Sequence, residues 1–220
     1  MRDLNQSIIR FNYDQNFTDD DFYVSKSNEH IFLLLNKWPK WEKNFLNIIG
    51  EKFSGKTHLS NIFIKKFKGI KLDSSSLKND DLIKIKIHEN IILEDLDENV
   101  DEKLLYSLLN IIDLDNKYII VTSNIPIVDI KFSLNDLKSR TKNFLLQNIE
   151  KPDDNLVFAL ILKNLSDRQI SIDKKLIDFI IKRIHRSYSK IFDFIYKVDE
   201  LSLKKKKPID LKIIKEVLGE

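Results

Sequence analysis

The chain has 220 residues, of which 42% are hydrophobic and 32% charged, and its formal net charge is +3. This balance is typical of a globular, soluble protein, and so small a net charge gives no argument for nucleic-acid binding. The sequence contains no cysteine, which excludes disulfides and thiolate zinc sites, and its four histidines lack the spacing of metal ligands.

The N-terminal stretch MRDLNQSIIRFNYDQ is polar and charged and does not have the pattern of a signal peptide. No apolar run approaches the roughly 20 residues that a membrane-spanning helix needs. We therefore expect a cytoplasmic protein with no membrane contact. Residues 1–20 are predicted to form an extended arm.

Strand-like and helix-like segments alternate between residues 21 and 150. The expected helices cover 28–36, 55–67, 75–87 and 101–113, and the expected strands cover 45–49, a short stretch from 69, 90–95 and 117–124. This alternation indicates an α/β fold, with a central parallel sheet that is covered by helices on both faces.

The pattern becomes entirely helical after residue 150. Four helical segments are predicted, at 152–168, 173–186, 187–205 and 210–220. Residues 151–220 are therefore expected to form a small all-helical domain. The run Lys204–Lys207 fits a solvated helix end, with a nucleic-acid contact as the alternative.

The segment Gly50–Thr57 reads GEKFSGKT and lies between a predicted strand and a predicted helix. The pattern G-x-x-x-x-G-K-T in this setting predicts a phosphate-binding loop. Gly50 and Gly55 would let backbone N–H groups point at phosphates, and Lys56 would contact the outer phosphates. The Thr57 hydroxyl would bind Mg²⁺. The sequence therefore predicts a site for ADP or ATP with Mg²⁺.

Polar residues end the next two predicted central strands. Glu94 and Asp95 follow the apolar run IIL, so that one acid could hold Mg²⁺ through water and the other could orient an attacking water. The alternative is an ordinary acidic turn. Asn124, at the end of IIVTSN, could reach the γ-phosphate or the attacking water.

Two arginines are candidates for charge stabilisation. Arg140 follows a helical pattern in DLKSRTKN and could point outward, at a nucleotide held by a neighbouring molecule. Arg186 could fold back onto the phosphates from the helical domain. Each could instead be a surface arginine beside an acid. We expect His58, which follows the loop, to pack or cap rather than to catalyse.

Taken in order, these motifs resemble the AAA+ module of the bacterial replication initiator DnaA over almost the whole chain. DDFYVSKSNEHIF is similar to a leading segment that packs beside the adenine in that family, although Ser25 stands where a glycine is usual. GEKFSGKTHL matches Walker A with its following His-Leu. IILED stands at Walker B, TSN at sensor I, LKSR at the arginine-finger box and HRSYSKIF at sensor II.

The resemblance implies a role for each matching residue. It implies catalytic roles for Glu94, Asp95 and Asn124, a finger role in trans for Arg140, and Mg²⁺ contacts from Thr57 and Glu94. The nucleotide contacts that it implies are Val24, Asn28, Gly50, Ser54, Gly55, Lys56, Thr57, His58 and Arg186. The fold that it implies is an AAA+ P-loop domain at 21–150 with a helical lid at 151–220.

We expect no helix-turn-helix domain after the lid and no long domain before the sheet, and such a bare AAA+ module resembles Hda, the DnaA-homologous regulator of initiation. In that family a short N-terminal motif docks in the apolar pocket of the replicative sliding clamp. The stretch QSIIRF keeps Gln6, Ile9 and Phe11 of that motif, while Ser7 replaces the usual apolar residue.

The resemblance implies that the chain, bound to a nucleotide and to the clamp, inserts Arg140 at the active site of ATP-bound DnaA and promotes hydrolysis, which blocks initiation. The chain's own nucleotide would then be a switch that sets the lid angle. DnaA has Asp-Asp where this chain has Glu94 and Asp95, so we expect weak hydrolysis by the chain itself.

Two other functions remain open on the sequence. The chain could be a self-assembling ATPase that resembles helicase loaders and remodels a partner by its own nucleotide cycle. It could also be an adaptor that holds DNA through Lys204–Lys207, although weak or indirect DNA contact is the expectation at this net charge.

Overall fold

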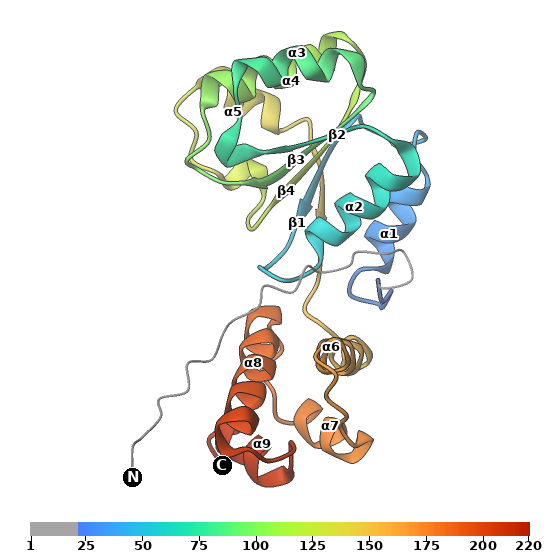
Figure 1. Cartoon of the computed structure of the whole chain (residues 1–220). Helices are drawn as coiled ribbons and strands as arrows, with labels where there is room; N and C mark the ends of the chain where they lie inside the picture. Colours follow the sequence, from blue (N-terminus) through green and yellow to red (C-terminus); the bar gives the residue numbers. More distant parts are fainter. Residues whose placement is uncertain (1–21) are drawn as a thin grey trace.

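A five-stranded parallel sheet lies at the centre of the N-terminal part of the molecule, in a computed structural model that describes residues 22–220 (Figure 1). The strand order is β2-β3-β4-β1-β5. The strands are β1 (Phe45–Ile49), β2 (Ile70–Asp73), β3 (Asn90–Leu96), β4 (Tyr118–Ser123) and β5 (Leu145–Asn148). The predicted α/β class is confirmed, while Gln6, Ile9 and Phe11 lie outside the described residues.

Helices cover both faces of the sheet. On one face lie α1 (Glu29–Asn36) and α2 (Lys56–Phe67), and on the other lie α3 (Asn79–Lys84), α4 (Glu102–Leu114) and α5 (Asn135–Thr141). Successive residues of a strand point to opposite faces, so Ile91 and Leu93 pack in the α4 layer while Ile92 packs in the α2 layer. Buried on both sides, β1, β3 and β4 read as the apolar runs from which they were predicted, although β1 carries the buried Asn47 at its centre.

The single helix predicted at 75–87 is wrong. The chain instead forms a 3-10 turn at Ser74–Ser76, then the short helix α3, then a second 3-10 turn at Ile85–Ile87. The Asp73 side chain accepts from the Ser75 N–H at 2.8 Å, and the Asp81 side chain accepts from the Lys78 N–H at 3.0 Å. These local side-chain bonds start two separate short turns and so compete with one continuous helix.

The strand β5 was not predicted. It pairs with β1 at the edge of the sheet, with Leu145 partly buried and Leu146 exposed. Its four residues, LLQN, show neither a continuous apolar run nor an alternation of apolar and polar residues. Its pairing becomes visible only when β1 is placed beside it.

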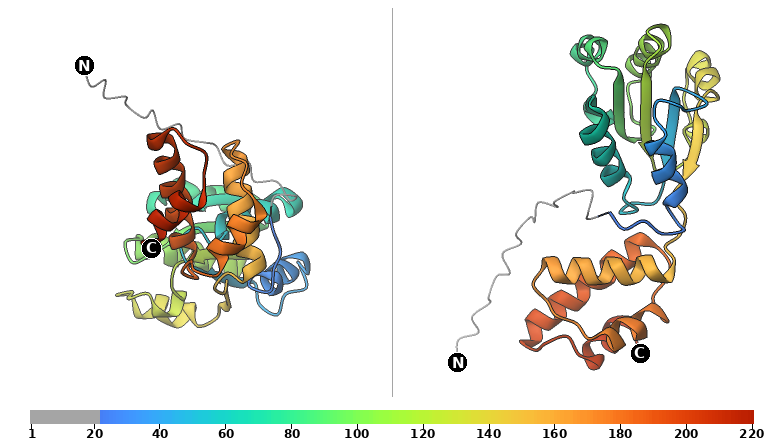
Figure 2. Two further views of the ribbon diagram at one scale, coloured as in Figure 1. Left: turned by 90° about the horizontal axis from the view of Figure 1, so that it is seen from below. Right: turned by 90° about the vertical axis from the view of Figure 1, so that its right-hand side faces the viewer.

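Residues beyond β5 form four helices with an apolar core of their own. They are α6 (Asp154–Asp167), α7 (Lys174–Ile181), α8 (Tyr188–Lys205) and α9 (Leu211–Leu218). Figure 2 shows these helices beyond the ends of the strands, at the end of the sheet where the β1–α2 loop lies. The helix α7 ends five residues before the predicted position 186, because the chain turns there towards α8. No helix among residues 22–220 is long and apolar enough to cross a membrane.

Asn47 is a fully buried polar residue in the middle of β1. Its Nδ2 donates to Val121 O at 3.1 Å and to Ser123 Oγ at 2.9 Å, while its Oδ1 accepts from the Ile127 N–H at 2.9 Å. One amide thus ties β1 to β4 and to the loop that follows β4. A buried amide is tolerated in a core when its partners are all present, as they are here.

We predict that Asn47→Ala lowers the free energy of unfolding by about 1–3 kcal/mol, because it leaves the Ile127 N–H buried without an acceptor. Urea unfolding followed by circular dichroism measures this loss. The matched control is Asn143→Ala, at an exposed asparagine after α5, which should change stability little. Equal effects of the two substitutions would contradict the structural role of Asn47.

Candidate functional site

The loop between β1 and α2 has the strand–loop–helix geometry that the sequence predicted. It leaves β1 after Ile49, and α2 begins at Lys56, with Gly55 as its N-cap at φ +98°. A Cβ on Gly50 would lie 2.5 Å from Ser54 Oγ and 3.3 Å from Ile149 Cβ, so a side chain there would displace the Ser54 hydroxyl. Gly55 is favoured by its positive φ, and Gly50 leaves room for Ser54 in a backbone that can wrap a phosphate.

Lys56 is buried at the centre of this loop. Its Nζ donates to Gly50 O at 2.6 Å, to Glu51 O at 3.2 Å and to Asn124 Oδ1 at 3.1 Å. The structure thus brings together the predicted loop lysine and the predicted polar residue after β4. Burial lowers the pKa of Lys56, and the negative charges of Asp95 and Glu51 oppose that shift.

The two acids after β3 have different surroundings. Glu94 Oε2 lies 2.9 Å from Lys71 Nζ, whereas Glu94 Oε1 is buried and has no hydrogen-bond partner among residues 22–220. Asp95 is exposed and has φ +51°, at an irregularity in the pairing of β3 with β4. The Asp95 N–H donates to Thr122 Oγ1 at 3.0 Å, which fixes the backbone there.

The residues present fit a nucleotide phosphate with Mg²⁺. Ser54 Oγ and Glu94 Oε1 are both buried without a partner in the described part of the chain. Buried polar atoms of this kind are usually hydrogen-bonded or coordinated by a ligand, an ion or a water. Thr57, partly buried in the first turn of α2, supplies a hydroxyl at the same end of the helix. Carboxylate and hydroxyl oxygens are ligands that Mg²⁺ prefers.

The leading segment turns tightly before α1. Asn28 is buried, its Oδ1 accepts from the Ser25 N–H at 2.9 Å, and its Nδ2 donates to Tyr23 O at 3.1 Å. Its amide is therefore engaged within the segment. Phe22 lies edge-on to the buried His58, with ring centroids 5.1 Å apart, so that His58 packs beside the loop.

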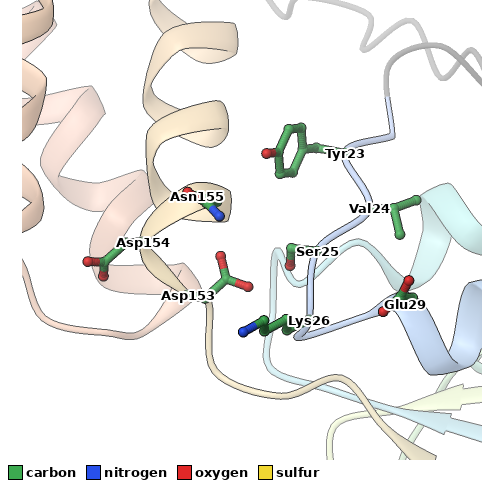
Figure 3. A pocket seen from close by; sticks show the side chains of 8 residues that line it. All are labelled: Tyr23, Val24, Ser25, Lys26, Glu29, Asp153, Asp154 and Asn155. Carbon is green, nitrogen blue, oxygen red and sulfur yellow. The ribbon is translucent and has the colours of Figure 1, made fainter.

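A cavity of about 520 Å³ lies between this segment and the start of α6 (Figure 3). Tyr23 and Val24 leave the backbone on opposite sides (Figure 3). The volume is within the range of small-molecule sites. The lining residues are Tyr23, Val24, Ser25, Lys26, Glu29, Asp153, Asp154 and Asn155.

The two candidate arginines are both held by acids of the chain. Arg186 Nη2 lies 2.6 Å from Asp154 Oδ1, while its Nη1 is buried without a partner in the described structure. Arg140 Nη1 lies 2.8 Å from Asp113 Oδ2, and its guanidinium is 5.8 Å from the Tyr106 ring. These contacts of Arg140 are with α4, on the sheet face opposite α2. The structure does not bring Arg140 to the chain's own loop.

Sequence reasoning missed the role of Glu51. Its carboxylate accepts hydrogen bonds from the Ser187 hydroxyl, from the Tyr188 N–H at 3.1 Å and from the Ser189 N–H at 3.4 Å. Burial raises the pKa of the Glu51 carboxyl, but these hydrogen bonds outweigh it, so the pKa lies below its usual 4.5. The only sequence signal was an acid within the loop and a Ser-x-Ser helix start far along the chain, and nothing in the sequence pairs them.

Comparison with known proteins places the helical part in a family. Residues 153–218 match the family model described as "Hda, lid domain". The chromosomal replication initiator protein DnaA of Thermoanaerobacter sp. (strain X514) is 24% identical over 243 residues, which cover 99% of this chain and 55% of that protein. The chain thus spans about half the length of the curated relatives that it matches.

Solved structures of DnaA share the fold. Domain III of the Thermotoga maritima replication initiation protein DnaA superposes with a TM-score of 0.72 at 20% identity, covering 92% of this chain and 95% of that one. AMPPCP-bound DnaA from Aquifex aeolicus superposes with a TM-score of 0.67 at 18% identity, covering 86% and 69%. The lid family, the DnaA relatives and the shared fold together identify the chain as an AAA+ protein of the Hda/DnaA-like kind.

Proposed function

We propose that this chain binds ADP or ATP with Mg²⁺ and promotes hydrolysis of the ATP that is bound to DnaA, so that it negatively regulates the initiation of DNA replication. The observation that carries the proposal is an Hda-type lid joined to a sheet whose phosphate loop keeps its lysine and both glycines. DnaA is the proposed partner because the relatives of the chain are DnaA proteins.

The nucleotide would lie along the loop between the sheet and the lid. Lys56 and Asn124 would meet its outer phosphates, Thr57 and Glu94 would hold Mg²⁺, and Arg186 would approach from the lid. The cavity beside Val24 would take the base. In the proposed arrangement residues 21–150 bind the nucleotide, residues 151–220 form the lid, and the bound ion neutralises phosphate charge.

Weak hydrolysis by the chain itself is supported by the two acids after β3. The Lys71 ammonium partly neutralises Glu94, which would hold the ion. Asp95 is the shorter acid and is exposed, so that an attacking water would be poorly positioned. In this proposal the nucleotide acts as a switch for the lid rather than as fuel.

Arg140 would act on the nucleotide of the partner. Its ion pair with Asp113 is half open to solvent, with 21% of the Arg140 side chain and 55% of the Asp113 side chain exposed. Pairs of this kind contribute about 0–1 kcal/mol, so a triphosphate of the partner would displace Asp113. The guanidinium would then stabilise charge on the transferring phosphoryl group.

The sliding clamp is the second proposed partner. Its proposed binding residues are Gln6, Ile9 and Phe11 in the N-terminal arm, residues 1–20. Docking on a clamp that encircles DNA would bring the chain to DnaA without strong DNA contact of its own. The proposal places this activity in the cytoplasm, with self-association as a further property to test.

The first prediction from this proposal concerns nucleotide binding. Lys56→Ala should weaken the affinity for a fluorescent ADP analogue by about 10- to 100-fold, because a charged hydrogen bond to phosphate is lost. The matched control is Lys52→Ala, which removes the same charge from an exposed position of the same loop. If both variants lose affinity equally, the loop lysine has no special role.

The second prediction concerns the partner's hydrolysis. With the host's DnaA loaded with ATP and the clamp loaded on DNA, the full chain should accelerate release of inorganic phosphate. Arg140→Ala should abolish the acceleration, since a finger in trans is worth roughly 10³–10⁵ in rate. Lys138→Ala, which removes an exposed cation from the same helix, should remain active. Full activity of Arg140→Ala would refute the finger role.

The third prediction concerns the ion pair that holds Arg140. Asp113→Asn should raise the acceleration of DnaA hydrolysis by about two- to fivefold at subsaturating chain, because an exposed ion pair of up to 1 kcal/mol no longer competes. The same phosphate-release assay measures it. A fall in activity would indicate that Asp113 positions Arg140 for the partner instead of restraining it.

A further inference from the structure

The phosphate loop and the lid touch through two residues that the predicted nucleotide chemistry does not use. Glu51 and Phe53 occupy variable positions of the G-x-x-x-x-G-K-T pattern. Glu51 meets the start of α8, as described above. The Phe53 ring stacks on the Phe192 ring of α8, with centroids 4.8 Å apart and planes at 23°. The loop thus holds one lid helix at two points.

The contact at Glu51 has the chemistry of a helix cap. The first N–H groups of a helix have no acceptor within the helix, and its N-terminus carries a partial positive charge. Ser187 is the N-cap of α8. The Glu51 carboxylate accepts from the Ser187 hydroxyl and from the N–H groups of Tyr188 and Ser189. A charged cap from another domain therefore completes this helix.

A second set of contacts fixes the same helix end to the sheet. Tyr188 is buried within the α1–α2 core, and its hydroxyl donates to Glu150 O at 3.0 Å. Arg186, the lid arginine, directly precedes Ser187, the N-cap of α8. Glu51 therefore contacts the helix at residues that directly follow Arg186 in the chain.

The backbone carbonyl of Glu51 faces the interior of the loop. Lys56 Nζ donates to the Glu51 carbonyl, and the charges of Glu51 and Lys56 interact. A phosphate in the loop would compete with the carbonyl oxygens of Gly50 and Glu51 for Lys56, since a phosphate is the stronger acceptor for an ammonium. The backbone that carries the cap is thus the backbone whose carbonyl groups hold Lys56.

We propose that Glu51 is a positioning residue that couples the occupant of the phosphate loop to the lid, with the Phe53–Phe192 stack as the second contact of this loop–lid latch. Without nucleotide the latch holds α8 against the loop. With nucleotide it transmits the rearrangement of residues 50–56 to α8 and Arg186. The inference rests on the proposed nucleotide binding only for its second half.

The absence of cysteine from the sequence allows a direct test in the full-length chain. Lys103→Cys in α4 and Lys197→Cys in α8, both at exposed positions, provide sites for a donor and an acceptor dye. Single-molecule energy transfer then reports the position of the lid. In the nucleotide-free chain we expect one narrow distribution of efficiency.

Removal of the latch should release the lid. Glu51→Ala and, independently, Phe53→Ala should lower and broaden the efficiency, while Glu51→Gln, which keeps an acceptor oxygen but loses the charge, should give an intermediate result. Glu98→Gln, at an exposed acid in the β3–α4 turn, is the matched control and should leave the distribution unchanged. Unchanged distributions for both Glu51→Ala and Phe53→Ala would overturn the latch.

The coupling itself is tested by adding nucleotide. ADP and a non-hydrolysable ATP analogue should shift the efficiency of the parent chain. Glu51→Ala should bind them with an affinity reduced by about two- to tenfold, the scale of a lost cap, yet show no shift. A normal shift in Glu51→Ala overturns the coupling. If the parent chain binds neither nucleotide, the proposed function and the coupling both fail, whereas the nucleotide-free distributions still decide the latch.

The pH dependence of stability tests the charge of Glu51 separately from its packing, because a contact that acts through packing alone does not change with pH. The ionisable groups that face the Glu51 carboxylate are Lys56 and Tyr188. Because its folded pKa is below 4.5, the stabilisation from Glu51 is present above pH 4.5 and is lost as the pH falls through the folded pKa. The difference in urea midpoint between the parent chain and Glu51→Gln should therefore vanish once the pH is below the folded pKa of Glu51. A difference independent of pH would mean that the charge of Glu51 does not hold the latch.

Discussion

The buried ammonium of Lys56 is the constraint around which the site is arranged. It lies where the carboxyl ends of β1 and β4 meet, and it is held by a backbone oxygen from the first and a side-chain oxygen from the second. A parallel sheet brings these ends to one edge, and loops at that edge are where α/β proteins bind ligands. The burial that lowers the pKa of Lys56 is tolerated because three oxygens and two nearby carboxylates compensate it.

The central strands and the loop were predictable because their signals are local. The strands β1, β3 and β4 are buried on both faces and read as apolar runs, and the glycines of the loop stand at fixed spacing. These few segments predicted the α/β fold, and the observed sheet and its likeness to DnaA confirm it. The short strand β5 and the broken helix near Asp81 escaped prediction, because strand pairing at an edge and side-chain bonds to the backbone decide them.

The contacts between segments that are distant in the chain could not be predicted from the sequence. Glu51 was an unremarked residue of the loop until the fold placed it at the start of α8, 136 positions away. Asp113 was likewise no candidate until α4 and α5 packed side by side and put it at the guanidinium of Arg140. Such pairs depend on how the helices and strands pack in three dimensions, and a single sequence does not show which distant residues come into contact.

The position of Phe53 has a consequence for how the two domains can be exchanged or diverge. Loops of this kind are usually described by their glycines, lysine and threonine, with the intervening residues treated as spacers. Here two of these intervening residues contact the lid helix α8, Glu51 through its charge and Phe53 through its aromatic ring. A lid transplanted from another protein would meet an acid without a helix end to cap and a ring without a partner. We therefore expect the lid and these two loop positions to change together in evolution, although more than a hundred residues of sequence separate them.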